Sequence, residues 1–305
     1  MIDQVTIHQL ELFLVAAKLK NFSRAADQMA ISQPAFSAQI IKLEKILGTP
    51  LFERIGRKIE LTETGLTFES YVQNSLSTLR EGKQALDDMA KKFIGTLRIG
   101  ASTTIANYVL PVVLGKYRKA YPECKVKMMV NNTGHIEQAL LRSEIDMGLV
   151  EGPIQNVKRI ASYLYKKDEL VVVFSSKHRW RNKTKLTMEE IQKEPLIIRE
   201  RGSGTRKVFT DIMDKDHAPL NIAMELGNTE AIKKSAEANI GVAVISSSSI
   251  AREIKDKTLK FARIVDHPIE RRLSLILLEK KYISNPLKAF IKILDPEEKP
   301  VVKQD

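Results

Sequence analysis

Hydroxyl and amide side chains stand at five places where a predicted strand is followed by a predicted helix. Free backbone N–H groups and the positive end of the helix favour anions there, and Arg201 or Arg206 would supply a counter-charge. Because such strand ends line a crevice in open α/β sheets, we expect a small anionic metabolite as ligand. Simple N-capping is the alternative for any single position, whereas five corresponding positions favour a shared site. The predicted contacts are Ser102, Thr103, Thr104, Asn132, Thr133, Glu151, Arg201, Ser203, Thr205, Asn228, Thr229 and Ser246.

The segments that would position these residues alternate between strand and helix from residue 97 onward. This rhythm is typical of a parallel sheet covered by helices. Because it runs through two rounds, we expect two lobes. Strands are predicted at 97–100, 125–130, 145–150, 169–174, 196–199, 221–226, 242–245 and 271–279. Helices are predicted at 105–121, 136–142 and 284–294, and from Thr205 and Thr229.

The first 61 residues have a different pattern, which indicates a compact DNA-binding unit. An amphipathic helix at 7–19, a helix capped by Ser23 and a third helix opened by Pro34 predict a helix-turn-helix, with the third helix in the major groove. A glutamine amide bonds adenine bidentately, so Gln33 is the strongest candidate for a base contact. Two short strands around 55–57 would form a wing that touches phosphates. Including capping and surface positions, the predicted DNA contacts are Ser23, Ser32, Gln33, Pro34, Ser37, Lys42, Arg54, Arg57 and Lys58.

A long helix is predicted from Thr62 to about Phe93, with apolar residues at alternating three- and four-residue steps. A helix of roughly 30 residues spans about 45 Å, which is longer than a small domain needs for itself. We therefore expect this helix to pair with the same helix of a second subunit. A linker helix packed on its own chain is the alternative.

Composition limits the remaining classes of function. The net charge is +12, but residues 1–93 hold 12 Lys and Arg against 11 Asp and Glu, whereas residues 94–305 hold 37 against 26. The local motif, rather than overall charge, therefore identifies the DNA site. Five scattered histidines, a single cysteine and the absence of a phosphate-loop motif argue against an enzyme, a metal site or a cofactor. Strand-sized apolar runs, no secretion signal and one cysteine predict a cytoplasmic protein with no membrane partner.

The N-terminal segment contains the motifs FLVA (13–16), NFSRAA (21–26), ISQPAFS (31–37), IIKLEKILG (40–48), LFER (51–54) and LTETG (61–65). These motifs closely resemble those of the LysR-type transcriptional regulators. One departure is Ala38, where many members carry Arg, which puts a contact at that position in doubt. The resemblance implies a receptor shaped like a type 2 periplasmic binding protein, chain crossings between its lobes near 163–168 and 264–269, and a tetramer. The segments at 151–153 and 199–206 are similar to those of family members that regulate sulfur assimilation and carbon fixation.

Together these patterns predict a regulator that binds double-stranded promoter DNA and senses a small anionic metabolite. The expected domains are a winged helix-turn-helix at 1–61, a dimerisation helix at 62–93 and an α/β effector domain at 94–305. Its lobe I is expected at about 94–165 and 267–296, and its lobe II at about 166–266. A homodimer or homotetramer is expected, and RNA polymerase is a candidate further partner. An architectural DNA-binding protein and a solute-binding protein are the alternatives.

Overall fold

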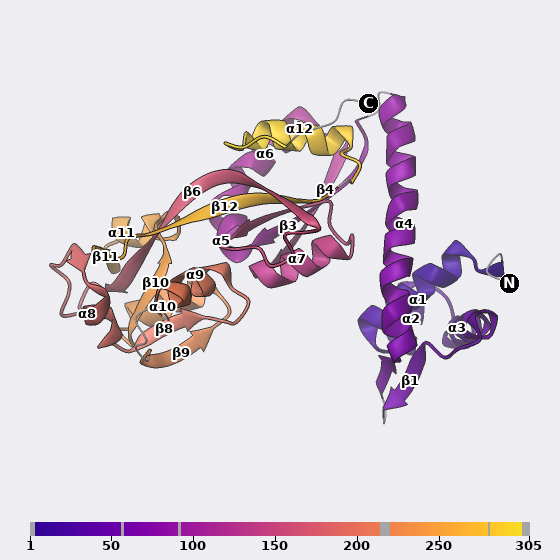
Figure 1. Ribbon diagram of the computed structural model, residues 1–305, viewed down its shortest axis with the longest axis horizontal. Helices are drawn as coiled ribbons and strands as arrows, with labels where there is room; N and C mark the ends of the chain where they lie inside the picture. The colour runs from indigo at the N-terminus through magenta and orange to yellow at the C-terminus, as the bar shows by residue number, and fades with distance from the viewer. Residues whose placement is uncertain (1–3, 56–57, 91–92, 214–219, 280, 301–305) are drawn as a thin grey trace. The chain divides into compact units, whose positions relative to one another are not determined.

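A computed structural model describes residues 4–55, 58–90, 93–213, 220–279 and 281–300 (Figure 1). The chain divides into two compact units, residues 1–86 and 87–305. Each unit has a hydrophobic core of its own. The two units are therefore described one at a time.

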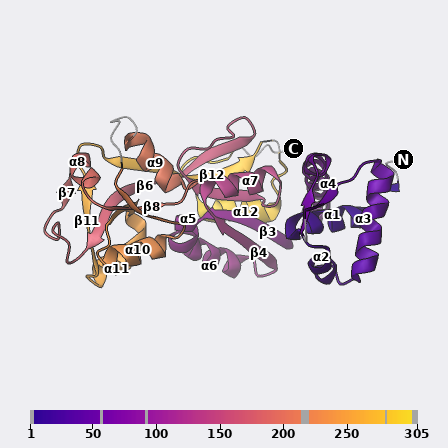
Figure 2. The ribbon, with the colours of Figure 1, turned by 90° about the horizontal axis from the view of Figure 1, so that it is seen from below.

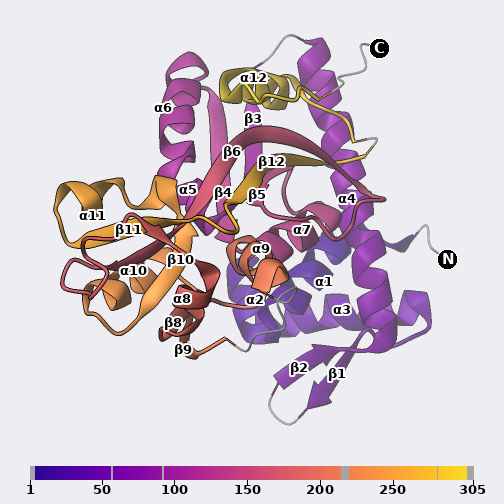
Figure 3. The same cartoon turned by 60° about the vertical axis from the view of Figure 1, so that its left-hand side comes forward.

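The N-terminal unit packs three short helices and a two-stranded hairpin around one core. Phe13, Phe36 and Leu43 are fully buried at its centre, from two different helices. The hairpin strands pair antiparallel, with Phe52 opposite Leu61 (Figure 3). The elements are α1 (Ile7–Leu19), α2 (Phe22–Gln28), α3 (Gln33–Leu47), β1 (Phe52–Ile55), β2 (Lys58–Leu61) and α4 (Glu63–Met89).

Local capping explains where α2 and α3 begin and end. Ser32 caps α3 by accepting from the Ala35 backbone N–H, and Gly48 ends the helix in the left-handed conformation at φ 73°. The residue that caps α2 is Asn21, whose side chain accepts from Arg24, so the prediction that Ser23 caps this helix is wrong. Ser23 instead lies inside the first turn, where its side chain is exposed.

The long helix α4 ends at Met89, before the predicted end at Phe93. Val72 and Leu76 pack into the N-terminal core. Leu79 and Leu86 remain 55% and 68% exposed. The second half of the apolar stripe is thus not covered by the described part of this chain.

The C-terminal unit is built on one ten-stranded sheet with helices packed against it (Figures 1 and 2). The strand order is β4-β3-β5-β12-β6-β10-β8-β9, and β11 and β7 pair beside β6. Its strands are β3 (Gly95–Ser102), β4 (Cys124–Asn131), β5 (Met147–Glu151), β6 (Ile160–Ser175), β7 (Lys185–Leu186), β8 (Leu196–Arg199), β9 (Ile222–Leu226), β10 (Val242–Ser246), β11 (Leu259–Ile264) and β12 (Ile269–Leu278). Its helices are α5 (Thr103–Tyr108), α6 (Leu110–Ala120), α7 (Thr133–Leu141), α8 (Met188–Gln192), α9 (Gly204–Met213), α10 (Thr229–Glu237), η3 (Ser247–Ser249), α11 (Ala251–Lys255) and α12 (Asn285–Leu294).

Two strands, β6 and β12, connect two lobes with separate cores. Along β6, Tyr165 belongs to the core of the first lobe and Leu170 to that of the second. Along β12, Leu273 and Ile269 are divided in the same way. We call these halves lobe I and lobe II. The paired strands are therefore the two chain crossings between the lobes.

Three features of the C-terminal unit differ from the sequence prediction. The helix expected at 105–121 is two helices that divide at Val109, because Pro111 has no N–H with which to continue the hydrogen bonds of the first helix. The strand expected at 169–174 extends back to Ile160 through a polar stretch that has no apolar run. The short elements β7, α8, η3 and α11 were not predicted, since each is too brief to show a period. The six-residue strand β11 was also not predicted.

Candidate functional site

The exposed edge of α3 carries the predicted base-reading residues. Gln33 begins the helix, and its side-chain amide donates a hydrogen bond of 2.9 Å to the Ser37 hydroxyl one turn later. Gln33 is exposed in the first turn, and Ser37 is half-buried beside the stripe that buries Phe36 and Ile40. The pair can therefore offer an amide and a hydroxyl to base edges from one face of the helix.

The remaining predicted DNA contacts are spread over three elements. Ser32 and Pro34 are exposed at the start of α3, and Lys42 is exposed near its middle. Arg54 is exposed on β1 of the hairpin. Arg57 and the side chain of Lys58 lie outside the described residues. Arg24 on α2 and Ile41 on α3 are also exposed. Neither was predicted to contact DNA, although each is next in sequence to a predicted contact.

Lobe I brings Ser102, Thr133 and Glu151 together at the boundary with lobe II. The Ser102 hydroxyl donates to the Glu151 carboxylate, and the Thr133 hydroxyl donates to the Glu151 backbone carbonyl at 2.9 Å. All three residues are buried. Gly204 of lobe II lies directly against them, so that a Cβ on it would be 1.8 Å from the Glu151 carbonyl oxygen. The two lobes are in close contact here.

A buried guanidinium lies at the centre of this boundary. Arg271 on β12 is 4% exposed, and its Nε donates to the Asp168 carboxylate on β6 at 2.7 Å. Its Nη1 donates to the Thr205 hydroxyl at 2.6 Å and lies 3.7 Å from a Glu151 carboxylate oxygen. Its Nη2 is buried and has no hydrogen-bond partner among the described residues. Such an unsatisfied donor is costly, so this atom is a ready contact for an added acceptor.

The same carboxylate gathers hydroxyls from lobe II. Asp168 accepts from Ser246 at 2.7 Å and from Ser248 at 3.2 Å, in addition to Arg271. Neither Asp168 nor Arg271 was a predicted site residue. The available signal was a run of charged residues in each strand, 166–169 and 270–272, beside apolar residues.

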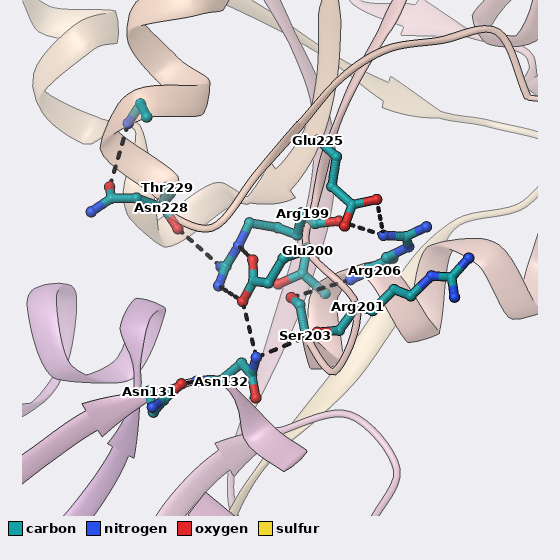
Figure 4. Close-up of polar contacts among 12 residues, drawn as sticks. Asn131, Asn132, Arg199, Glu200, Arg201, Ser203, Arg206, Glu225, Asn228 and Thr229 are labelled. Atoms are coloured by element: carbon teal, nitrogen blue, oxygen red, sulfur yellow. Dashed lines mark hydrogen bonds and ion pairs between the residues drawn. The ribbon is translucent and has the colours of Figure 1, made fainter. Parts of the chain in front are cut away.

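A second contact between the lobes joins Asn132 to Glu200 (Figure 4). The Asn132 amide donates to the Glu200 carboxylate at 3.3 Å and to the Arg201 carbonyl at 3.4 Å. Buried Arg199 holds the same carboxylate with two bonds and donates to Thr229 at 3.2 Å. Burial raises the pKa of Glu200, but the bonds and charge of Arg199 outweigh it and bring this pKa below the usual value. Glu200 is thus held as an anion between the lobes.

The two predicted counter-charges occupy other places. Arg206 donates to Glu225 at 2.7 Å and to the Arg199 carbonyl at 3.1 Å. Arg201 is exposed, and its side chain points away from Asn132 and Glu200 in Figure 4. The cation at the buried boundary is therefore Arg271.

The other predicted effector residues lie at helix starts. Asn228 caps α10 through bonds to the Glu230 and Ala231 N–H groups. Ser203 and Thr104 are buried, whereas Thr103 is half-buried. Of the predicted set, Ser102, Thr133, Glu151, Thr205 and Ser246 meet around Arg271 and Asp168.

The described residues contain neither a metal-binding cluster nor a membrane-spanning helix. No group of three or more His, Cys, Asp or Glu in this part of the chain could hold a metal ion. No helix described is long and apolar enough to cross a membrane.

A winged helix-turn-helix in one chain with a two-lobed α/β domain defines a DNA-binding transcriptional regulator with a ligand-binding domain. Two family models match: the bacterial regulatory helix-turn-helix protein, lysR family, over residues 7–66, and the LysR substrate binding domain over residues 90–298. The chain belongs to the LysR family of transcriptional regulators, which confirms the predicted resemblance and fold class.

Curated relatives match nearly the whole chain. A probable RuBisCO transcriptional regulator of Emiliania huxleyi is 35% identical, over 94% of this chain and 93% of its own length. The transcriptional activator CmpR of Synechocystis is 31% identical over 95% and 94%. YeiE of Escherichia coli, an uncharacterized HTH-type transcriptional regulator, is 34% identical over 97% and 99%. These relatives are all transcriptional regulators.

Solved structures share the fold. Full-length CbnR complexed with its target DNA is 21% identical, with a TM-score of 0.68 over 95% of this chain and 99% of CbnR. The regulatory domain of Synechocystis CcmR, in complex with 2-PG, is 28% identical, with a TM-score of 0.62 over 66% of this chain and 95% of that domain.

Proposed function

We propose that this LysR-type regulator binds a small anionic metabolite between lobes I and II, with Arg271 as its central contact. The observation that carries this proposal is the buried Nη2 of Arg271, which has no hydrogen-bond partner in the part of the chain that the structure describes. An acceptor on the metabolite would satisfy that donor and remove the cost of leaving it unpaired. A carboxylate or phosphate oxygen forms the strongest bond of this kind.

The starts of α7 and α9 add to this preference for an anion. Asn132 and Thr133 stand at the start of α7 in lobe I, and Ser203 and Thr205 at the start of α9 in lobe II. Free N–H groups at helix starts favour negative charge. This contribution is needed, because Asp168 and Glu151 already place two carboxylates beside Arg271.

The ligands of related domains have the expected chemistry. CcmR binds 2-PG, 2-phosphoglycolate, which carries a carboxylate and a phosphate. The effector domain of QuiR, which shares the fold at a TM-score of 0.60, binds shikimate, a carboxylate. Both therefore support the class of ligand, and neither identifies the metabolite of this chain.

Regulation would follow from the contacts that the ligand changes between the lobes. A ligand shifts an equilibrium only by its differential affinity for the two arrangements. The proposed organisation is a reader at 1–61, a dimerisation helix at 62–93 and a receptor at 94–305. The exposed Leu79, Leu86 and Met89 on α4 support pairing of two subunits. Dimerisation doubles the reader and favours a two-fold symmetric operator.

The proposed location, oligomeric state and partners rest only on membership of the LysR family. We place the protein in the cytoplasm, as a homodimer or homotetramer that acts on promoter DNA and has no catalytic activity. RNA polymerase is a proposed partner at the promoter. In this proposal Gln33 and Ser37 contact bases, and Arg54 and the rest of the wing contact phosphates.

Binding of a panel of small anions to the full chain tests the effector site. The panel contains 2-phosphoglycolate, shikimate, inorganic phosphate and sulfate, measured by calorimetry and by the shift of thermal unfolding. We expect at least one organic anion to bind. Arg271→Lys should weaken this binding, because lysine has a single side-chain nitrogen and no counterpart of Nη2. A matched variant, Arg263→Lys, changes an exposed arginine of lobe II and should bind normally. Equal affinity in both variants would contradict the assignment of Arg271.

A further inference from the structure

The segment between β6 and α8 is strongly basic. Residues 177–185 contain five Lys or Arg and no Asp or Glu. The side chains of all five cations are exposed. This segment lies with α8, β7 and β11 at one end of lobe II (Figures 1 and 2). It is far in sequence from the helix-turn-helix and is not part of the boundary between the lobes.

Buried aromatic residues anchor this segment. His178 and Trp180 alternate with the cations and are 9% and 3% exposed. Their rings lie 4.9 Å apart, and both contact Phe174 of the lobe II core. Backbone bonds from Arg181 to His178 and from Lys183 to Trp180 close successive turns, at 2.9 and 2.7 Å. The cations therefore extend from an ordered backbone, which lowers the entropy lost on binding.

A sixth cation joins the five through the sheet. β7 pairs with β11 so that Lys185 is opposite Arg263, which is also exposed. We call these six residues the basic surface: Lys177, Arg179, Arg181, Lys183, Lys185 and Arg263.

Half of the basic surface is neutralised within lobe II. Arg179 pairs with Glu194, Lys183 with Glu190, and Arg263 with Glu169. In the described part of the chain, Lys177, Arg181 and Lys185 have no ion-pair partner. These three charges are available to an external anion.

We propose that the basic surface binds phosphates of duplex DNA, outside the bases that α3 reads. A protein partner would be expected to need an apolar centre, but the one large apolar side chain of residues 177–185, Trp180, is buried. Repeated phosphates match a set of cations without apolar neighbours. The excess charge of the chain also lies in residues 94–305, whereas the DNA-reading segment is nearly neutral.

This contact adds affinity without adding sequence preference. Lysine and arginine release counterions from the phosphate backbone whatever the base sequence is. Once α3 has bound an operator, the flanking duplex is held nearby, and its high effective concentration lets a weak second contact contribute. Binding to long duplexes should therefore depend more steeply on salt than the reader alone would produce.

Neutralising the three unpaired cations tests the proposal. In the full chain, Lys177→Gln, Arg181→Gln and Lys185→Gln are combined, which leaves no carboxylate without its partner. The matched control combines Lys158→Gln, Lys288→Gln and Lys292→Gln, three exposed lysines of lobe I that have the same total charge. Affinity for a random-sequence duplex of about 60 base pairs is measured by fluorescence anisotropy over a salt series.

The expected result is a weaker salt dependence in the first variant alone. Each lost phosphate contact lowers the slope of log affinity against log salt by about 0.9, so three contacts lower it by about 2 to 3. Equal slopes for the variant, the control and the unchanged protein would overturn the proposal. So would unchanged DNA binding together with lost binding to purified RNA polymerase, which would assign the surface to an acidic protein. No effector enters the measurement, so its outcome is independent of the proposed ligand site.

Discussion

Arg271 and Asp168 lie opposite each other on β12 and β6, with the guanidinium Nε 2.7 Å from the carboxylate. These are the two strands that connect the lobes. The pair is also bonded to Thr205 and Ser246 of lobe II. A change in the position of lobe II therefore alters the contacts of a buried charge, which makes this pair sensitive to a ligand at the boundary.

The first prediction concerns the stability contributed by this buried pair. Asp168→Ala leaves Arg271 buried with its Nε unpaired, and should lower the free energy of unfolding by about 3–5 kcal/mol. Neighbouring Glu169 pairs with exposed Arg263, so Glu169→Ala should cost less than about 1 kcal/mol. The free energy of unfolding of both variants is measured from the urea-induced unfolding transition of the effector domain. Similar losses would contradict the central role given to the buried pair.

The second prediction concerns base recognition by α3. Gln33→Ala should reduce discrimination between a selected operator and its single-base variants by about 1–3 kcal/mol, if the amide bonds a base bidentately. Ser37→Ala should have a smaller effect in the same direction, because Ser37 accepts a hydrogen bond that orients Gln33. Arg54→Ala, on β1 of the wing, serves as a control for a lost phosphate contact and should weaken all sequences equally. Unchanged discrimination in Gln33→Ala would assign this residue to capping alone.

The sequence predicted the elements but not the central ion pair. The apolar stripe of α3 and the hydroxyls at strand ends are local patterns, and local patterns can be read from spacing. Arg271 and Asp168 are 103 residues apart, and their contact depends on the pairing register of two strands. Half of β6 was missed because it carries polar residues where the chain passes between the lobes.

Capping shows a further limit of sequence reasoning. Asn21 and Ser23 are both good N-cap residues, and the sequence alone does not distinguish them. The backbone decides, because Asn21 is extended at φ −157° and ψ 115° while Ser23 is already helical. Arg201 and Arg206 looked equally suited to an anion, but their positions depend on how the loop before α9 folds.

The third prediction concerns the close approach of the lobes at Gly204. In Gly204→Ala the new Cβ would lie 1.8 Å from the Glu151 carbonyl oxygen, which is backbone and cannot move aside alone. We expect the lobes to separate, effector affinity to fall and hydrogen exchange to rise around Thr205. Gly115→Ala on α6 is the matched control, because no atom lies within 4 Å of its Cβ. That change should stabilise α6 by up to about 1 kcal/mol. Normal effector binding in Gly204→Ala would show that the contact is not required.

The last prediction concerns a third contact between the lobes, which includes a tyrosine that loses its proton at high pH. Tyr108 on α5 of lobe I donates to Glu230 on α10 of lobe II, and the buried Lys233 ammonium lies 5.0 Å from the centre of the tyrosine ring. Burial, aided by the bond to Glu230, raises the pKa of Tyr108 to about 12 from its ordinary value of 10.0. Lys233 itself is held by Glu230 and by Glu253, at 2.7 and 2.8 Å.

A raised tyrosine pKa has a defined effect on stability. The folded protein keeps the phenol proton in a range where the unfolded chain has lost it, so the contribution is complete below pH 10 and is lost as the pH rises through about 12. We expect the stability of the unchanged protein to fall more steeply across this window than that of Tyr108→Phe, which has no proton to lose. Tyr163→Phe on lobe I controls for the loss of a tyrosine. Parallel pH profiles for Tyr108→Phe and the unchanged protein would mean that the Tyr108 bond does not hold the lobes together, since a phenol that donates to Glu230 must resist ionisation.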